Sequence, residues 1–494
     1  MSRPDTESRL YNADLAPESA SGTWKTWNLF AWWMSGWHSL AGYSVAIGLF
    51  ALGLAGWEVA IAFIVGVVIL YFANNLSGVA GQREKVPFPV FARASFGVRG
   101  ANIPALLRGI VGVFWYGVQT YLASHAVLIL LLKAAPGLAP MTEVSFLGLS
   151  ALGWICFVLL SILQLLALSK GMETVRRLSD FAGPVIWVAM IALAIWMLER
   201  AGWSIDLNYR AVGEGGGVIG FAAAAFILVA YFGGPTLNFA DFSRNAPSPG
   251  AVRKGNVLGL LINASAFGLI SIVIALAAVK VHGDVVSDPV LLLKDLDNVA
   301  ALLVALIAVA IATAGINVIY NFVAPVYDIL QVWPRGFTFR SAGILVAVLS
   351  IVITPWNLFA NPVIVNQMIG AVGALMGPLF GVIMVDYYLI RGKKFSTEAL
   401  FDDAPTGEYW YRSGYNVRAL IALLIAGFVT IIMTVVPALS SVTAFTWPVG
   451  VIIGGGAYFL IARGTRTGGA ASVTVAAADA PGPVLDEDRV AGTR

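Results

Sequence analysis

Apolar segments of about 20 residues, separated by short polar ones, follow one another along most of the chain, and this is the length that a helix needs to cross a bilayer. We therefore predict about twelve membrane-spanning helices, at residues 28–50, 57–78, 101–133, 148–169, 180–199, 217–239, 257–280, 298–327, 341–357, 363–390, 417–437 and 443–463. The pattern indicates an all-α integral membrane protein whose membrane domain covers residues 25–463.

The two ends of the chain depart from this pattern. Residues 1–24 are polar and have no apolar stretch of the kind found in a cleaved signal peptide, so we expect a cytoplasmic N-terminal tail. Residues 464–494 are rich in Ala, Gly, Thr and Asp, which is typical of a disordered tail, also cytoplasmic.

The distribution of charged residues predicts the orientation of the helices in the membrane. Only 12% of the 494 residues are charged, against about a quarter in soluble proteins. Basic residues gather after every second helix, at Arg83, Lys85, Arg93, Arg99, Lys170, Arg176, Arg177, Arg244, Arg253, Lys254, Arg335, Arg340, Arg391, Lys393, Lys394, Arg412 and Arg418. Such loops stay in the cytoplasm, which predicts a multi-pass protein of the cell membrane with both termini inside. Bases that flank membrane segments also argue against nucleic-acid binding.

The candidate chemistry excludes several classes of protein. Cys156 is the single cysteine, so a disulfide within one chain is excluded. The sequence has no metal-ligand spacing, no nucleophile beside a histidine and an acid, and no phosphate-binding loop. We therefore predict neither an enzyme nor an ATP-driven pump, and no cofactor.

Two of the predicted helices are interrupted. Residues 28–50 contain Gly36 and Gly42 around the polar residues Ser35, His38 and Ser39, and residues 217–239 contain a Gly-Gly-Pro sequence at 233–235. Glycine weakens a helix and proline removes a backbone donor, so freed backbone groups must face protein, water or a ligand. The breaks lie five helices apart, as an inverted repeat of helices 1–5 and 6–10 would place them, with two extra helices at the C-terminus. The alternative is that Gly and Pro are simply common in membrane helices.

Polar and aromatic side chains inside the apolar segments are candidates for a binding site. Trp115 and Gln119 are four residues apart and share one helix face, where they would suit a planar ring with an amide-like edge. Asn321 could present a second amide and Phe232 a second aromatic face. The alternative for Gln119 is a hydrogen bond between helices, and for Asn317 we favour that interpretation.

Four short motifs resemble the nucleobase–cation symporter family, which includes purine–cytosine permeases and uracil, allantoin and hydantoin transporters. They are SFGVRG at 95–100, FWYGVQ at 114–119, NFADFSR at 238–244, and GPLFG at 377–381 followed by DYY at 386–388. The resemblance runs from about Trp24 to Lys394. It implies a five-plus-five inverted repeat with discontinuous helices 1 and 6.

The same resemblance implies roles for individual residues. Trp115 would stack on the substrate ring, Gln119 and Asn321 would bind it by hydrogen bonds, and Phe232 would be the second stacking aromatic. Further contacts would fall in the breaks, at His38 or Ser39 and at Gly233.

The resemblance also implies a coupling cation, and here the chain departs from the family pattern. A cation site would fall at Ser35, Ala312, Gly315 and Ile316. Sodium-coupled members have helix 8 hydroxyls where this chain has Gly315 and Ile316, and a hard cation requires several oxygen ligands. We therefore favour H⁺ over Na⁺ as the coupling ion, with His38 as a candidate proton carrier.

Taken together, these observations predict a secondary active transporter that imports a nucleobase or cyclic ureide, such as cytosine, uracil, a purine, allantoin or a hydantoin, by alternating access. Its partners would be that planar heterocycle, the coupling cation and membrane lipid. One alternative is a symporter of the same fold for an amino acid or a thiamine precursor. A channel would require a continuous polar stripe or a charged ring, and the sequence contains neither.

Overall fold

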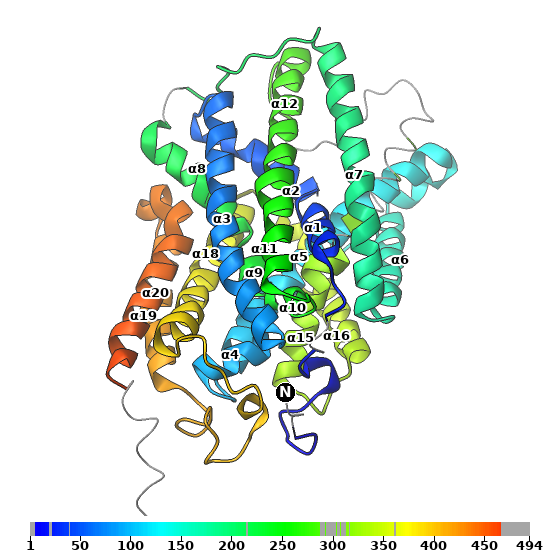
Figure 1. The fold of residues 1–494 in the computed structure, drawn as a ribbon. Coiled ribbons are helices and arrows are strands. Elements are labelled where there is room, and N and C mark those ends of the chain that lie inside the picture. Colours follow the sequence, from blue (N-terminus) through cyan, green and yellow to red (C-terminus); the bar gives the residue numbers. More distant parts are fainter. Residues whose placement is uncertain are drawn as a thin grey trace, which may run out of the picture.

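The computed structural model describes residues 5–18, 22–38, 40–213, 216–286, 317–359 and 362–465, together with 292, 303, 307 and 313–315. These residues form a bundle of long helices (Figure 1). The N-terminal segment lies at one end of the bundle, near α4 (Phe88–Phe96) and α15 (Val323–Val332). We call this end the N-face.

The first half of the bundle comprises α1 (Thr26–Trp37), α2 (Leu40–Gly48), α3 (Gly56–Glu84), α4, α5 (Asn102–Ala134), α6 (Ala151–Leu168) and α7 (Met172–Arg200). The second half comprises α8 (Gly217–Tyr231), α9 (Gly233–Leu237), α10 (Ala240–Ser243), α11 (Pro249–Asn256), α12 (Ser265–His282), α15, α16 (Phe339–Val352), α17 (Pro355–Phe359) and α18 (Pro362–Val385). Two further helices, α19 (Val417–Val435) and α20 (Thr446–Ala462), end the described chain and pack beside α18.

The predicted membrane spans agree with this architecture. Eight described helices are long and apolar enough to cross a membrane. Three shorter apolar helices, Gly42–Leu52, Gly217–Tyr231 and Phe339–Val352, overlap the predicted helices 28–50, 217–239 and 341–357. Residues 298–302, 304–306, 308–312 and 316 of the predicted helix 298–327, and the C-terminal tail from residue 466, lie outside the described residues.

Three local features were not predicted. A two-stranded antiparallel hairpin, β1 (Ser145–Phe146) and β2 (Leu149–Ser150), precedes α6, so the chain is not strictly all-α. Helix α4 forms within a predicted loop. Helix α7 begins eight residues before the predicted start, because Glu173 pairs with Arg176 and Arg177 along its first turns and stabilises a helix outside the apolar run.

Both predicted helix breaks are present. Helix 1 is divided at His38, whose backbone angles (φ −81°, ψ 60°) are not helical. Helix 6 is divided at Phe232, between α8 and α9. Pro235 has no N–H to give to the carbonyl of Tyr231, which explains why the helix is interrupted here.

The described chain also contains three π-helical segments, at Val257–Ala264, Val318–Phe322 and Asp386–Ile390. The second of them lies directly before α15. Pro325 cannot donate to the carbonyl of Asn321, and a π segment in a helix often marks a functional position. This segment carries Tyr320 and Asn321 into the interior of the bundle.

The N-terminal segment is packed against the N-face. Leu15, in a short 3-10 helix (Ala13–Leu15), is completely buried. Arg93 donates to the carbonyl of Leu10 (3.1 Å), and Arg244 donates to the carbonyls of Asp14 (3.2 Å) and Ala16 (3.3 Å). Residues 5–18 therefore cover the N-face.

Candidate functional site

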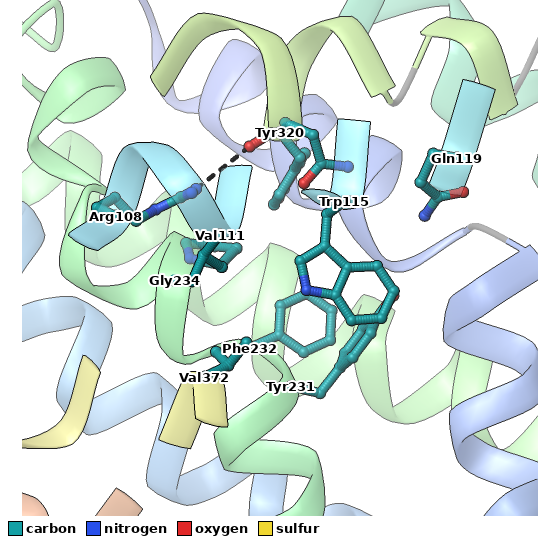
Figure 2. Close-up of a pocket in the computed structure, with 12 residues that line it drawn as sticks. Arg108, Val111, Trp115, Gln119, Tyr231, Phe232, Gly234, Tyr320 and Val372 are labelled. Atoms are coloured by element: carbon teal, nitrogen blue, oxygen red, sulfur yellow. Dashed lines mark hydrogen bonds between the residues drawn. The ribbon is translucent and has the colours of Figure 1, made fainter. Parts of the chain in front are cut away.

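A pocket lies at the two helix breaks, where α1, α5, α9, α18 and the π-helical segment Val318–Phe322 meet. It contains about 500 Å³ of space, including solvent at its opening. Its lining includes Trp115, Gln119, Phe232 and Asn321, the four residues predicted to bind a ring (Figure 2). Their chemical roles remain predictions, but the fold brings all four together.

Trp115 supplies an aromatic surface. Phe114 and Tyr231 meet its ring nearly at right angles, with interplanar angles of 79° and 87°. In the described part of the chain, no aromatic ring stacks parallel to Trp115. A planar ligand could therefore make the stacked contact that the protein itself does not.

Gln119 lies one turn further along α5 and is 3% exposed. Its Oε1 has no hydrogen-bond partner among the described residues. A buried carbonyl left in this state costs about 1–3 kcal/mol, which an N–H group of a ligand would recover.

Asn321 is oriented by a buried amide network. Its Nδ2 donates to Asn317 Oδ1 (3.1 Å). Asn317 donates in turn to Tyr116 O, Thr120 Oγ1 and Gln164 Oε1, at 2.8–2.9 Å. These bonds confirm the prediction that Asn317 joins helices, and they hold Asn321 toward the pocket.

The helix 6 break contributes Phe232 and the backbone beside it. Phe232 stacks on Trp37, with ring centroids 3.9 Å apart and an interplanar angle of 25°. Gly234 lines the pocket, whereas a Cβ at Gly233 would meet Trp447 at 3.0 Å. Gly233 faces α20 because one residue along a helix turns the side-chain direction by about 100°.

His38 does not line the pocket. Its Nδ1 lies 3.3 Å from the carbonyl of Gly183, and its ring contacts Trp187 and Phe267. The break in helix 1 turns this side chain toward α7. Ser39 lies outside the described residues.

Two of the four predicted cation-site residues are described, and both face α7. The Ser35 hydroxyl donates to the carbonyl of Ser179 (3.1 Å). A Cβ at Gly315 would lie 3.3 Å from Ala182 Cβ. Ala312 and Ile316 lie outside the described residues.

Arg108 is a pocket residue that sequence reasoning missed. It is 1% exposed, and its Nε donates to Asn238 Oδ1 (3.0 Å) and its Nη2 to Tyr320 O (3.5 Å; Figure 2). Arg108 precedes Trp115 by seven residues, two helical turns, so both lie on one face of α5. A lone arginine within the apolar segment 101–133 was the available signal.

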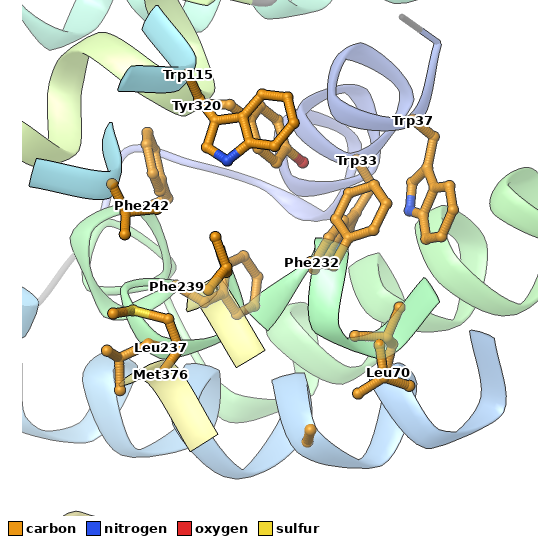
Figure 3. Close-up of a cluster of buried hydrophobic side chains, with 14 of the residues drawn as sticks. Trp33, Trp37, Leu70, Trp115, Phe232, Leu237, Phe239, Phe242, Tyr320 and Met376 are labelled. Atoms are coloured by element: carbon orange, nitrogen blue, oxygen red, sulfur yellow. The ribbon is translucent and has the colours of Figure 1, made fainter. Parts of the chain in front are cut away.

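A cluster of aromatic rings packs around Trp32 and reaches the pocket through Tyr320. Tyr320 stacks on Trp32 (4.3 Å, 19°) and donates to its carbonyl (3.0 Å). The rings of Phe239 and Phe242 also contact Trp32, with centroid distances of 4.9 and 4.7 Å. Figure 3 shows Phe239, Phe242 and Tyr320 in this cluster. We call these four residues the inner aromatic layer.

Comparison with known proteins decides the family. A sequence model of the family described as "Permease for cytosine/purines, uracil, thiamine, allantoin" matches residues 17–450. The chain belongs to this permease family. The allantoin permease of Bacillus subtilis is 34% identical to this permease over 462 residues, 92% of this chain and 94% of the relative. The purine-uracil permease of Arabidopsis thaliana is 32% identical, over 86% of this chain and 71% of the relative.

A solved structure supports the fold. Mhp1, a nucleobase-cation-symport-1 family transporter in a closed conformation with bromovinylhydantoin bound, superposes with a TM-score of 0.76 at 22% identity, covering 92% of this chain and 95% of Mhp1. The predicted family and fold are thus confirmed. This permease is a multi-pass membrane transporter and not an enzyme.

Proposed function

We propose that this permease carries a nucleobase or a cyclic ureide, which stacks on Trp115 and binds Gln119 and Asn321 through its amide-like edge. The proposal depends on the unpartnered carbonyl of Gln119 beside the ring of Trp115, on which no other described aromatic ring is stacked. A flat ring with neighbouring N–H and C=O groups satisfies both features at once. Uracil and allantoin are the first compounds to test, because relatives named for them align along most of this chain.

We further propose that transport is coupled to H⁺. Gly315 offers no side-chain oxygen, and the hydroxyl of Ser35 is already engaged with Ser179 O. A sodium ion would therefore find no side-chain ligand at Gly315, and it could use the Ser35 oxygen only beside the hydrogen bond that this hydroxyl donates.

We also propose that the N-face lies on the cytoplasmic side of the cell membrane and that both termini are in the cytoplasm. Lys85, Arg93, Arg244 and Arg335 all bond backbone carbonyls at this end of the bundle. Basic loop residues favour the cytoplasmic side.

Binding by purified protein tests the substrate class. Cytosine, uracil, hypoxanthine, allantoin, hydantoin, phenylalanine and thiamine are compared by thermal shift and calorimetry. We expect at least one of the nucleobases or cyclic ureides to bind, and neither phenylalanine nor thiamine. Gln119→Ala should weaken it by about 5–150-fold, since two hydrogen bonds contribute about 1–3 kcal/mol.

Gln82→Ala is the matched control, because Gln82 is also buried but donates to Ala246 O away from the pocket. Unchanged affinity in Gln119→Ala would refute the site. Binding of phenylalanine or thiamine alone would refute the substrate class. Uptake that requires sodium and ignores a proton uncoupler would refute H⁺ coupling.

A further inference from the structure

Two buried carboxyl groups near the pocket differ sharply in their partners. Asp241 is 1% exposed; its Oδ1 accepts from the Phe88 N–H (2.7 Å) and its Oδ2 from Asn238 Nδ2 (2.9 Å). Asp328 is 3% exposed, and neither of its oxygens has a hydrogen-bond partner among the described residues. A buried carboxylate without a partner is costly, and either a proton or a cation removes the cost.

Asp328 lies beside the wall of the pocket. A Cβ at Gly109 would be 3.4 Å from Asp328 Cβ and 3.7 Å from its Oδ2. Gly109 directly follows Arg108, whose guanidinium lines the pocket and attracts Asp328 electrostatically. The two distances at Gly109 are ordinary van der Waals distances, so Asp328 packs directly against α5 at this residue.

Arg108 thus lines the substrate pocket and also interacts electrostatically with Asp328. In the structure its Nε and Nη2 donate to Asn238 Oδ1 and Tyr320 O rather than to the carboxyl group. A charged Asp328 would draw the guanidinium away from these acceptors, because an ion pair in a low-dielectric surrounding is strongly attractive. A protonated Asp328 leaves Arg108 in place against the pocket and the inner aromatic layer.

We propose that Asp328 is the proton-carrying group of this permease, with Arg108 as the residue through which it senses the substrate. Protonation forms an O–H bond on one Asp328 oxygen and removes its negative charge. Arg108 then stays bonded to Asn238 and Tyr320, which preserves the pocket for the ring. The inference rests on the proposed substrate class and names the site of H⁺ coupling.

Other charged groups near α15 are already engaged. Asp241 repels a charge on Asp328 but is fully hydrogen-bonded. On α4, Arg93 donates to Gln331 (2.9 Å). Arg244 donates to the Tyr327 hydroxyl (2.9 Å). Arg108 is therefore the cation that responds to Asp328.

The test measures allantoin and uracil binding to the purified full chain between about pH 5.5 and pH 8, in choline chloride and in sodium chloride. For wild type we expect the dissociation constant to rise by about 5–150-fold across this range, the usual size of coupling between sites. A pH indicator in weak buffer should register uptake of about 0.4–0.8 proton per ligand where the slope is steepest, which is the most that one group can contribute to a 5–150-fold change.

Asp328→Asn mimics the protonated acid. We expect it to bind at pH 8 with the affinity that wild type has at pH 5.5 and to take up no proton. Tighter binding at high pH is a gain that a misfolded protein cannot produce, and Asp328→Glu should restore part of the pH dependence. Glu84 is also a buried carboxyl group, and it accepts a hydrogen bond from the Tyr387 hydroxyl. The control variant Glu84→Gln should therefore show the same affinity and the same proton uptake as wild type.

The outcomes separate the two proposals. If wild type binds neither ring, the proposed substrate class fails. If wild type binds but takes up no proton, or if its affinity follows sodium, the proton site is refuted. Retention of proton uptake in Asp328→Asn would also refute it, as would loss of all binding in both Asp328 variants.

Discussion

The inner aromatic layer can be opened by one added methyl group. Gly36 on α1 faces the ring of Tyr320, and a Cβ at this position would overlap the ring carbon and hydroxyl oxygen at its tip. Gly36→Ala therefore forces Tyr320 to move. Its ring cannot move without leaving its stacked position on Trp32 and the hydrogen bond to the Trp32 carbonyl.

The size of the effect follows from these two contacts. An aromatic pair contributes about 0.5–1.5 kcal/mol. A hydrogen bond contributes about 0.5–1.5 kcal/mol net. Their loss sums to about 1–3 kcal/mol, which raises the population with the layer open by about 5–150-fold, provided that both contacts exist only in the closed arrangement.

Hydrogen–deuterium exchange with mass spectrometry measures this population. Peptides covering 26–37 and 318–332 should exchange faster in Gly36→Ala by the same factor, because amides there exchange through the open state. Peptides from α19, on the far side of α18, should be unaffected.

Two further variants serve as a control without a clash and as a measure of the hydrogen bond alone. Gly48→Ala adds the same methyl group to α2, where nothing lies within 4 Å of the new Cβ, and should exchange as wild type. Tyr320→Phe removes only the hydroxyl and should accelerate exchange by about 2–13-fold. Equal exchange in Gly36→Ala and wild type would show that the layer does not depend on Tyr320.

Two further predictions concern residues outside the pocket. Asn317→Ala removes the acceptor that holds Asn321 and leaves Gln164 Oε1 without its donor. Calorimetry should therefore find allantoin binding weakened by about 5–150-fold, and thermal unfolding should occur at a lower temperature. Binding at wild-type strength would contradict the positioning role. Arg244→Lys keeps the charge but loses the guanidinium geometry that bonds Asp14 O and Ala16 O. Limited proteolysis should therefore cut this variant within residues 5–18 faster than it cuts Arg253→Lys, a control at an exposed position. Equal cleavage of the two variants would show that Arg244 does not hold the segment.

The sequence was informative wherever one helix decides the outcome. Apolar length predicts the spans, Gly-Gly-Pro predicts the break before Pro235, and a separation of four places Trp115 and Gln119 on one face of α5. Asn317 was assigned correctly because a buried amide must find partners. Each of these inferences needs only local spacing.

The remaining parts of the site depend on how helices meet. His38 was expected in the pocket, but the rotation at the helix 1 break sends it toward α7. The closeness of Asp328 to Arg108 requires that α5 and α15 approach at Gly109, which periodicity within either helix does not reveal. The overlap of Gly36 with Tyr320 is likewise a contact between helices from different halves of the chain.

One short stretch of chain joins every part of the proposed mechanism. Tyr320 closes the inner layer, Asn321 faces the pocket, Tyr327 bonds Arg244 under the N-terminal segment, and Asp328 lies near Arg108. These four residues fall within nine consecutive positions, and Pro325 between them removes one backbone hydrogen bond. A shift of this stretch must therefore disturb the layer, the pocket, the proton site and the N-face together. In the proposed mechanism the substrate acts at one end of this stretch and the proton at the other, so their coupling requires no long pathway.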